Sequence, residues 1–422
     1  MATSVIKWNQ GEGNIVATYE GSGNGPIAIT LEPNTGDARQ QEITIETADE
    51  SKIVTILVKQ AGGVVQHTYT RLTFIESTGS QYINTGYIVQ EDDVIEMQYI
   101  KTAQVSADQV LFGCSDSNGA LWYDIYSNSA YVRFGSDSSV TMSNARQKNR
   151  VTLQRGKANV DGTTATLPED GMPQVPLCLF ARSSGDSIVQ YGAYKSVGCT
   201  ITKTSGEAVM KLRPCKRDSD GAIGMLDLVS GIFFGNLGSG DDFSYGGEAH
   251  ITKDYEIVDY IAFNNDKIYD TGVYGNERTY FELLFERTDT SGADYIFGTS
   301  SGNRITGYLT TSGYWRYGSG YPTFNTNNKL LTYAEVTPGK TTVNHSSKTF
   351  SVGNAFQTQW PIPVGGHKPS SGVATKTFQG YLYYFRMRID DDYVADWIPC
   401  KRLSDGVEGF WDCVTQQFVE PI

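Results

Sequence analysis

The residues PCKRDSDGAIGMLD at positions 214–227 return as PCKRLSDGVEGFWD at positions 399–412, and nine of the fourteen positions are identical. Other matches lie in the same order along the chain at nearly the same spacing. They pair TFIESTGSQYINTG (73–86) with DYIAFNNDKIYDTG (259–272), VLFGCS (110–115) with YIFGTS (295–300), VRFGS (132–136) with WRYGS (315–319), and PLCLFA (176–181) with PIPVGG (361–366). Ordered matches at a nearly constant spacing indicate a duplicated unit. We therefore predict two related domains, residues 68–248 and residues 254–422.

Each copy consists of segments in which apolar and polar residues alternate. Examples are DVIEMQYI (93–100), VTLQRG (151–156) and GYLYYFRMRI (380–389). Alternation with a period of two is typical of strands that bury one face, and no run of ten or more residues has helical periodicity. The content of 45 Gly, 26 Tyr and 18 Phe agrees, because aromatic residues favour strands and Gly favours tight turns. The prediction is an all-β chain in which each copy is a two-sheet jelly-roll sandwich.

Residues 1–64 are predicted to form a separate N-terminal domain. The runs Ile43–Thr47 and Lys52–Gln60 are strand-like and are joined by a short polar turn, which predicts a hairpin. Two further strand-like runs, NIVATYE and PIAITLEP, come before it. Several short strands with such turns are typical of a small Ig-like sandwich.

Composition excludes several classes of partner. The chain has 34 Lys+Arg against 47 Asp+Glu and a net charge of −13, which argues against a nucleic-acid groove because phosphate binding needs a basic face. No run of about 20 apolar residues is present, so we expect no membrane insertion. The start, MATSVIKWNQGEGN, has neither a basic n-region nor an apolar h-region, so we expect synthesis and folding in a cytoplasm.

The cysteines and histidines predict neither a metal site nor a cofactor. The six cysteines contain no Cys-x-x-Cys pair, and the four histidines are scattered singly. Buried free thiols are the expected state of the cysteines. The cysteines are Cys114, Cys178, Cys199, Cys215, Cys400 and Cys413, and the histidines are His67, His250, His345 and His367.

The repeated phrase itself first suggests calcium, since oxygen ligands two residues apart begin many calcium loops. Asp218 and Asp220 have this spacing, but Ala222 stands where a third ligand would be, and the second copy has Leu403 in place of Asp218. The shared residues are Cys215, Ser219, Asp220, Gly221 and Asp227 in the first copy and Cys400, Ser404, Asp405, Gly406 and Asp412 in the second. Ser-Asp-Gly is a turn signature, because Asp caps its own backbone and Gly accepts positive φ. We predict a structural turn that closes each sandwich.

Two shared aspartates follow that turn among apolar residues. We predict that Asp227 and Asp412 are buried acceptors for turn N–H groups. The basic pairs Lys216–Arg217 and Lys401–Arg402 are their expected charge partners.

Catalytic signatures are missing from the sequence. A glycosidase needs two carboxylates that face each other across a cleft, and the acidic strings nearest to that pattern, residues 90–93 and 390–392, do not alternate along a strand. No Ser/His/Asp or Cys/His set, P-loop or dinucleotide Gly motif is present. We predict that the chain is not an enzyme, although a carboxylate pair across a cleft would reopen that alternative.

Two aromatic segments are candidates for sugar binding. ALWYDIYSNSAY (120–131) and TSGYWRYGSGY (311–321) are placed at equivalent positions of the two copies. If Trp122, Tyr126, Tyr314 and Trp315 face outward, they form a platform on which sugar rings stack. The alternative is that half of these rings face the core and the others shield a sandwich edge.

Both copies resemble the laminin-G/concanavalin-like domains of phage and prophage virion proteins. The resemblance rests on the opening FIESTGSQYINTG (74–86), the internal Phe-Gly strands and the closing PCKRDSDGAIGMLDLVSGIFFGNLGSG (214–240). Such domains end with Asp-Leu-Val, a Gly turn, an aromatic strand and an Asn, as residues 227–236 do. The second copy stops at residues 418–422 without this tail, so we expect its last strand to be shorter or capped by a neighbour.

The N-terminal domain resembles the end of BACON-type Ig-like domains of gut Bacteroidetes and their phages. The matching residues are Asn34-Thr35-Gly36, Arg39 and Gln60-Ala61-Gly62. Together the resemblances imply a non-enzymatic structural protein of a bacteriophage that infects gut Bacteroidetes. It would be made in the host cytoplasm and displayed on the virion as a capsid decoration, head fibre or tail appendage.

The implied partners are other virion proteins, bound through the N-terminal domain, with host-surface or mucin glycans and homo-oligomers left open. The alternative is a bacterial cell-surface or secreted polysaccharide-binding protein. That alternative needs an export leader, which the sequence as written lacks.

Overall fold

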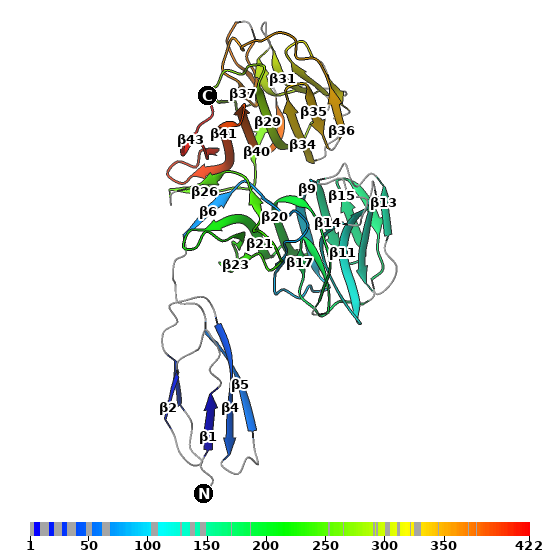
Figure 1. The fold of residues 1–422 in the computed structure, drawn as a ribbon, viewed down its shortest axis with the longest axis vertical. Helices are drawn as coiled ribbons and strands as arrows, with labels where there is room; N and C mark the ends of the chain where they lie inside the picture. Colours follow the sequence, from blue (N-terminus) through cyan, green and yellow to red (C-terminus); the bar gives the residue numbers. More distant parts are fainter. Residues whose placement is uncertain are drawn as a thin grey trace. The chain divides into compact units, whose positions relative to one another are not determined.

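The structure is a computed structural model of the chain. The residues that it describes are 4–8, 17–20, 28–31, 39–47, 53–60, 68–102, 109–126, 129–135, 140–143, 149–169, 171–185, 187–251, 254–264, 266–289, 292, 294–299, 304–309, 313–320, 322–324, 331–344, 346–369, 371–376 and 378–422. The chain divides into two compact units, Met1–Thr68 and Tyr69–Ile422. Each is described by itself below (Figure 1).

The first unit contains two antiparallel sheets. One has the order β1-β4-β5 and the other pairs β2 with β3. These strands are β1 (Ser4–Trp8), β2 (Ala17–Glu20), β3 (Ala28–Leu31), β4 (Arg39–Thr47) and β5 (Ile53–Gln60). The predicted hairpin is present, and its register runs from Arg39↔Gln60 to Glu46↔Ile53.

The first copy in the second unit contains two large sheets. One has the order β13-β12-β11-β10-β17-β8, and the other has the order β16-β15-β14-β9-β20-β21-β22-β23. The strands of the first sheet are β8 (Ile83–Asn84), β10 (Gln109–Asp116), β11 (Gly119–Tyr126), β12 (Ser129–Gly135), β13 (Val140–Ser143) and β17 (Cys178–Leu179). Those of the second are β9 (Asp93–Lys101), β14 (Arg150–Gln154), β15 (Lys157–Val160), β16 (Thr163–Thr166), β20 (Tyr194–Lys203), β21 (Ala208–Arg217), β22 (Ile223–Asp227) and β23 (Phe233–Gly235).

Several short strands join these two sheets outside the main order. They are β6 (Tyr69–Leu72), β7 (Ile75–Glu76), β18 (Ala181–Ser184), β19 (Ser187–Tyr191), β24 (Ser244–Tyr245) and β25 (Glu248–Ala249). β6 pairs with β21 and β25, whereas β7 pairs with β20 and β24. The segment that starts the first copy is therefore covered along one edge by the segment that ends it.

The second copy repeats this arrangement. Its sheets have the orders β36-β35-β34-β29-β40-β41-β42-β43 and β28-β37-β30-β31-β32-β33, while β26 pairs with β41 and β27 with β40. The strands of the larger sheet are β26 (Tyr255–Ile257), β27 (Ile261–Asn264), β29 (Thr279–Arg287), β34 (Leu331–Thr337), β35 (Lys340–Val343), β36 (Ser346–Thr349), β40 (Gln379–Ile389), β41 (Asp392–Arg402), β42 (Glu408–Asp412) and β43 (Gln417–Val419). Those of the smaller sheet are β28 (Tyr269–Asp270), β30 (Asp294–Thr299), β31 (Ile305–Leu309), β32 (Gly313–Tyr317), β33 (Thr323–Phe324) and β37 (Pro363–Val364), and a separate pair joins β38 (Gly366–His367) to β39 (Thr375–Lys376).

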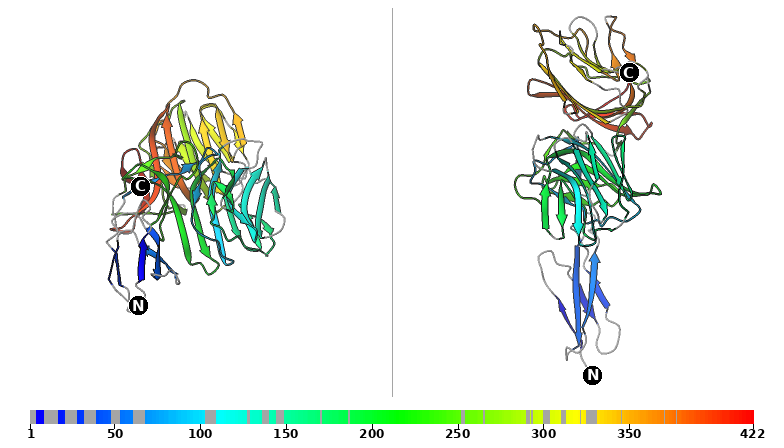
Figure 2. Two further views of the ribbon diagram at one scale, coloured as in Figure 1. Left: turned by 60° about the horizontal axis from the view of Figure 1, so that its bottom comes forward. Right: turned by 90° about the vertical axis from the view of Figure 1, so that its right-hand side faces the viewer.

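Each copy buries its own core between its two sheets. Along β9, Ile95, Met97 and Tyr99 are buried in the first core, as period-two alternation requires. Phe281 and Leu283 on β29 occupy the second core in the same way. The two groups of packed sheets are also distinct in Figure 2. The prediction of an all-β chain with tandem two-sheet sandwiches is therefore confirmed, while the predicted domain boundaries (1–64, 68–248 and 254–422) stay predictions.

Free cysteines are confirmed, and five of the six are buried, Cys413 being half-buried. Within the described ranges, no helix is long and apolar enough to cross a bilayer. In the same part of the chain, no group of three or more His, Cys, Asp or Glu side chains is placed to hold a metal ion.

Candidate ligand-binding site

The repeated Ser-Asp-Gly phrase forms the same turn in both copies. The Arg217 Nε donates to Asp220 Oδ1 at 3.0 Å, and the Ala222 N–H donates to the same oxygen at 3.1 Å. In the second copy Arg402 and the Val407 N–H contact Asp405 at the same two distances. Gly221 and Gly406 have φ of 76° and 75°, which only Gly adopts without strain. Cys215 and Cys400 are buried on the strands before these turns, while Ser219 and Ser404 lie exposed within them.

The shared aspartates accept hydrogen bonds from backbone groups. Asp227 Oδ1 accepts from the N–H groups of Lys211 and Val229 at 2.7 and 3.1 Å. Asp412 Oδ1 accepts from the N–H groups of Asp396 and Val414 at 3.0 and 3.1 Å. The predicted pairing of these aspartates with the basic residues is wrong for the two arginines. Arg217 and Arg402 bind the turn aspartates Asp220 and Asp405 instead. Lys216 pairs with Glu248. The phrase is thus a structural closure.

The four residues of the proposed glycan platform do not form one surface. Trp122 on β11 is half-buried, with the guanidinium groups of Arg133 and Arg182 at 4.8 and 4.5 Å from its ring centroid. Trp315 on β32 is fully buried in the second core, so it cannot meet a glycan. The side chains of Tyr126 and Tyr314 lie outside the described residues.

The reason for this correction lies in the register of the duplication. Because VRFGS matches WRYGS, Trp315 is the equivalent of Val132, which is also fully buried. Trp122 is on the preceding strand, where it pairs with Arg133. The prediction that the two aromatic segments occupy equivalent positions is therefore wrong.

A concave site lies between the two copies, within the second unit. It is a cavity of about 450 Å³ lined by residues of both sandwiches. The floor is defined as its residues from the first copy: Arg71, Leu72, Thr73, Val94, Glu96, Gln98, Arg150, Val197, Gly198, Thr200, Thr202 and Arg213. The roof is defined as those from the second copy: Val258, Asp259, Tyr260, Glu286, Tyr381, Tyr383, Ile398 and Pro399. We call the whole site the cleft.

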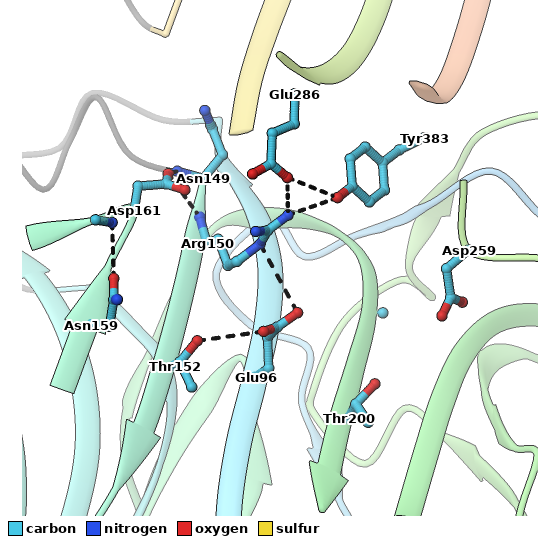
Figure 3. Close-up of polar contacts among 12 residues, drawn as sticks. Glu96, Asn149, Arg150, Thr152, Asn159, Asp161, Thr200, Asp259, Glu286 and Tyr383 are labelled. Atoms are coloured by element: carbon cyan, nitrogen blue, oxygen red, sulfur yellow. Dashed lines mark hydrogen bonds and ion pairs between the residues drawn. The ribbon is translucent and has the colours of Figure 1, made fainter. Parts of the chain in front are cut away.

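An ion-pair cluster joins floor and roof on one side of the cleft. The Arg150 Nη2 donates to Glu286 Oε2 and to the Tyr383 hydroxyl, both at 2.7 Å. Its Nε lies 3.9 Å from Glu96 Oε1, and Glu96 also accepts from Thr152 at 3.4 Å. Figure 3 shows Arg150 between the two glutamates.

Asp259 lies apart from this cluster (Figure 3), and it forms a second ion pair between floor and roof with Arg213. The Arg213 Nε and Nη2 donate to Asp259 Oδ1 at 2.8 and 2.7 Å, and Lys211 Nζ lies 3.2 Å from Oδ2. Burial opposes ionisation, but Arg213 and Lys211 hold the pKa of Asp259 below its usual value. Arg213 lies against Gly198, where a Cβ would be 2.7 Å from its Nη1.

Aromatic side chains form the roof between these ion pairs. The ring centroids of Tyr260 and Tyr381 are 4.4 Å apart, and the ring planes are tilted by 45°. The Tyr383 ring meets Tyr260 edge-on, with 5.7 Å between the centroids. Tyr260 is 41% exposed. On the floor below, Gln98 and Thr200 are half-buried, so an apolar wall faces hydroxyl and amide groups, as in sugar-binding sites.

A buried network fixes the orientation of the two copies beside the cleft. Glu282 accepts from Lys195 Nζ at 2.9 Å, from Arg386 Nη1 at 3.2 Å and from the Tyr384 hydroxyl at 3.1 Å. Asp396 accepts from Arg386 Nε and from Thr73 Oγ1, both at 3.0 Å. Lys195 and Thr73 belong to the first copy, so these contacts cross the joint between the copies.

Glu282 is ionised at neutral pH. Burial opposes the ionisation of Glu282, but Lys195 and Arg386 lower its pKa to about 2. Apolar side chains surround the network and also cross the joint: Ile100 and Val197 from the first copy pack with Leu284, Leu331, Tyr333, Tyr381, Tyr383 and Tyr384 from the second. The cleft is therefore a preformed site between two fixed bodies.

The cleft does bring two carboxylates, Glu96 and Glu286, to one place, which reopens the enzyme alternative. A glycosidase leaves the space between its carboxylates to the scissile bond or to water. Here the guanidinium group of Arg150 lies in that space and contacts both (Figure 3). The geometry therefore favours binding over hydrolysis.

The cleft was not predicted from the sequence, although the sequence contains one signal of it. Residues 382–385 read Leu-Tyr-Tyr-Phe, four apolar or aromatic residues in succession. A strand of this kind is covered on both faces, and the outer face of β40 is covered here by the first copy. The pairing of Arg150 with Glu286 carries no such signal, because it depends on how the copies meet.

Comparisons with known proteins give a structural match but no family. No family model matches the sequence, and no curated protein matches it. Among solved structures, the mouse laminin alpha1 chain, domains LG4-5, matches over 80% of this chain and 93% of that chain, with 13% identity and a TM-score of 0.26. The resemblance to laminin-G-like domains thus has a structural counterpart of low similarity, whereas the resemblance to phage and BACON proteins stays a prediction. A TM-score this low assigns no ligand or partner to this chain.

Proposed function

We propose that this chain is a non-enzymatic carbohydrate-binding protein that takes a sugar in the cleft between its two sandwiches. The observation that carries the proposal is that a tyrosine wall, the exposed Tyr260 and the half-buried Tyr381, lines the same cavity as the hydroxyl and amide groups of Thr200 and Gln98. Apolar faces of sugar rings stack on aromatic side chains, while their hydroxyl groups need fixed polar partners. The volume of about 450 Å³ is in the range of small-ligand pockets.

The biological setting that we propose is the surface of a bacteriophage particle. Residues 1–64 attach the chain to other virion proteins, and the tandem sandwiches are displayed as a capsid decoration, head fibre or tail appendage that meets host or mucosal glycans. This setting is supported by the sequence resemblance to virion and BACON-type domains. The competing setting is the surface of a bacterium, where the same site would hold a polysaccharide.

Binding is tested on a glycan array, followed by calorimetric titration of each hit. Tyr260→Ala is expected to weaken binding roughly tenfold or more, because it removes the stacking face. Tyr274→Ala is the matched control, since Tyr274 is a 44% exposed tyrosine of the same sandwich that does not line the cleft. An array without hits for the intact chain would contradict the carbohydrate proposal.

The setting is tested separately by mass spectrometry of purified particles and of fractionated bacterial envelopes. The polypeptide is expected in the particles. Its detection in the envelope fraction of uninfected bacteria would favour the bacterial surface protein.

A further inference from the structure

The strand registers define which residues of the two copies are equivalent at the joint. Thr200 pairs with Glu96 as Arg386 pairs with Glu282. Lys211 stands beside Thr200 as Asp396 stands beside Arg386. Likewise, Thr73 and Asp259 are equivalent, because Arg71 pairs with Cys215 as Ile257 pairs with Cys400. Each of these positions on one side of the joint therefore has a counterpart on the other.

The closed side of the joint is filled by side chains and by a strand. There the Arg386 guanidinium binds Glu282 and Asp396 and lies 5.2 Å from the ring of Phe74. The backbone of Gly246 lies against the same ring, since a Cβ there would be 2.8 Å from Phe74 Cε1. Phe74 is 3% exposed as a result.

The open side of the joint is the cleft. Thr200 stands where the closed side has Arg386, and Tyr260 stands where it has Phe74. In the described part of the chain, no strand covers residues 257–262 as β24 and β25 cover residues 71–76. Tyr260 is consequently 41% exposed, so the part of its ring that Tyr381 and Tyr383 do not cover is left to a ligand.

Backbone groups on the open side supply one donor and one acceptor. On the closed side, the Thr73 N–H donates to the Gly247 carbonyl at 3.2 Å, and the Gly246 N–H donates to the Phe74 carbonyl at 3.1 Å. The equivalent Asp259 N–H and Tyr260 carbonyl have no partner among the described residues. A hydroxyl group can satisfy both kinds of group, because it donates and accepts.

The size of the cleft favours a small molecule over an added strand. A six-residue strand such as residues 244–249 is about 20 Å long. A strand on this edge would have to pass both ion pairs that cross the cleft, Arg213–Asp259 and Arg150–Glu286. A single ring is much shorter than such a strand and need not pass either ion pair.

The charges around the cleft favour a neutral ligand. Its lining holds three arginines, Arg71, Arg150 and Arg213, against three carboxylates, Glu96, Asp259 and Glu286, so its net charge is zero at neutral pH. On the closed side, Asp396 is the partner of the Arg386 cation. Lys211 occupies the equivalent position on the open side, so a cation bound there would be repelled. An anion would have to compete with carboxylates already bound to Arg150 and Arg213.

We propose that the cleft binds one neutral sugar ring, stacked on Tyr260, whose hydroxyl groups pair with the Asp259 N–H and the Tyr260 carbonyl. This inference rests on the proposed function and adds the class of sugar and its position. The sugar ring would occupy the position on the open side that is equivalent to the one occupied by Arg386 and Gly246 on the closed side.

The experiment is a calorimetric titration of the full chain with three probes: neutral oligosaccharides, uronic-acid or sulfated oligosaccharides, and the peptide SYGGEA, which copies residues 244–249. Neutral sugars are expected to bind, and their Kd is expected to change less than twofold between 50 and 500 mM NaCl, since no ion pair forms. Tyr260→Phe should retain the affinity, and Tyr260→Ala should lose roughly tenfold. The Tyr274→Ala control should bind like the native chain.

Each other result is informative. A preference for the acidic sugars, with strong salt dependence, would overturn the neutral class and leave the proposed function in place. Neutral-sugar binding that survives Tyr260→Ala would overturn the position. Binding of the peptide without any sugar would overturn both this inference and the proposed function in favour of strand addition.

Discussion

The closed and open sides of the joint are built from equivalent positions, yet one is filled and the other is a cleft. On the closed side, Glu282 has Lys195 and Arg386 as partners, and a glycine-rich strand covers Phe74. On the open side, Thr200 is too short to fill the space of Arg386 and leaves Tyr260 uncovered. The difference indicates that the two sides have separate roles. The closed side holds the two copies in one orientation, and the open side uses that fixed orientation to present a site.

The largest effect is expected from breaking the closed side with Glu282→Ala. Glu282 is 1% exposed, and its removal leaves one carboxylate, Asp396, against the two cations Lys195 and Arg386, so that one buried positive charge is uncompensated. Breaking a buried ion pair in this way costs about 3–5 kcal/mol of the free energy of unfolding. The measurement is the guanidinium chloride midpoint followed by tryptophan fluorescence. Asp391→Ala, at a fully exposed carboxylate, is the control, and a loss below about 1 kcal/mol for Glu282→Ala would refute the anchoring role.

Low pH should also lower the free energy of unfolding, because it protonates Glu282 on the closed side. The folded-state pKa of Glu282 is about 2, below the unfolded value of about 4.3. Its contribution is therefore complete above about pH 4.5 and is lost as the pH falls toward 2, a change of about 3 kcal/mol. Burial raises the pKa of Asp396, so protonation of that group offsets part of the loss.

The test of this pH dependence is a pair of stability curves between pH 7 and pH 2, for the native chain and for Glu282→Gln. The difference between the two curves is expected to shrink as the pH falls, because glutamine does not titrate. A difference that stays constant would show that Glu282 does not carry the acid sensitivity.

The sequence predicts the two sandwiches but not the joint between them, as individual residues show. The duplication and alternating strands were readable because strand burial is a local, period-two property, and the equivalence of Trp315 with Val132 already implied a core position. The joint was not readable, since the contact between Arg150 and Glu286 joins residues far apart in the chain. It depends on the mutual orientation of the copies, which no local pattern encodes.

A smaller effect, on binding alone, is expected from filling the open side with Thr200→Tyr. The added ring would occupy the space below Tyr260 without adding a charge, so sugar affinity should fall roughly tenfold or more. The matched control is Thr164→Tyr, on an exposed position of β16 in the same sheet. Titration calorimetry measures the loss, and unchanged affinity in Thr200→Tyr would place the sugar outside the cleft.

The smallest effects concern the closing turns, where the two copies are alike and the comparison predicts no difference. A Cβ at Gly221 or Gly406 meets nothing nearer than the lysine Cε at 4.0 or 3.6 Å. The cost of Gly221→Ala and Gly406→Ala is therefore the backbone strain of φ near 75°, about 1 kcal/mol for each. Thermal unfolding should show equal losses, with little change in Gly292→Ala, which has neither a left-handed φ nor a neighbour within 4 Å. Unequal losses would mean that the asymmetry between the copies extends beyond the joint into the turns.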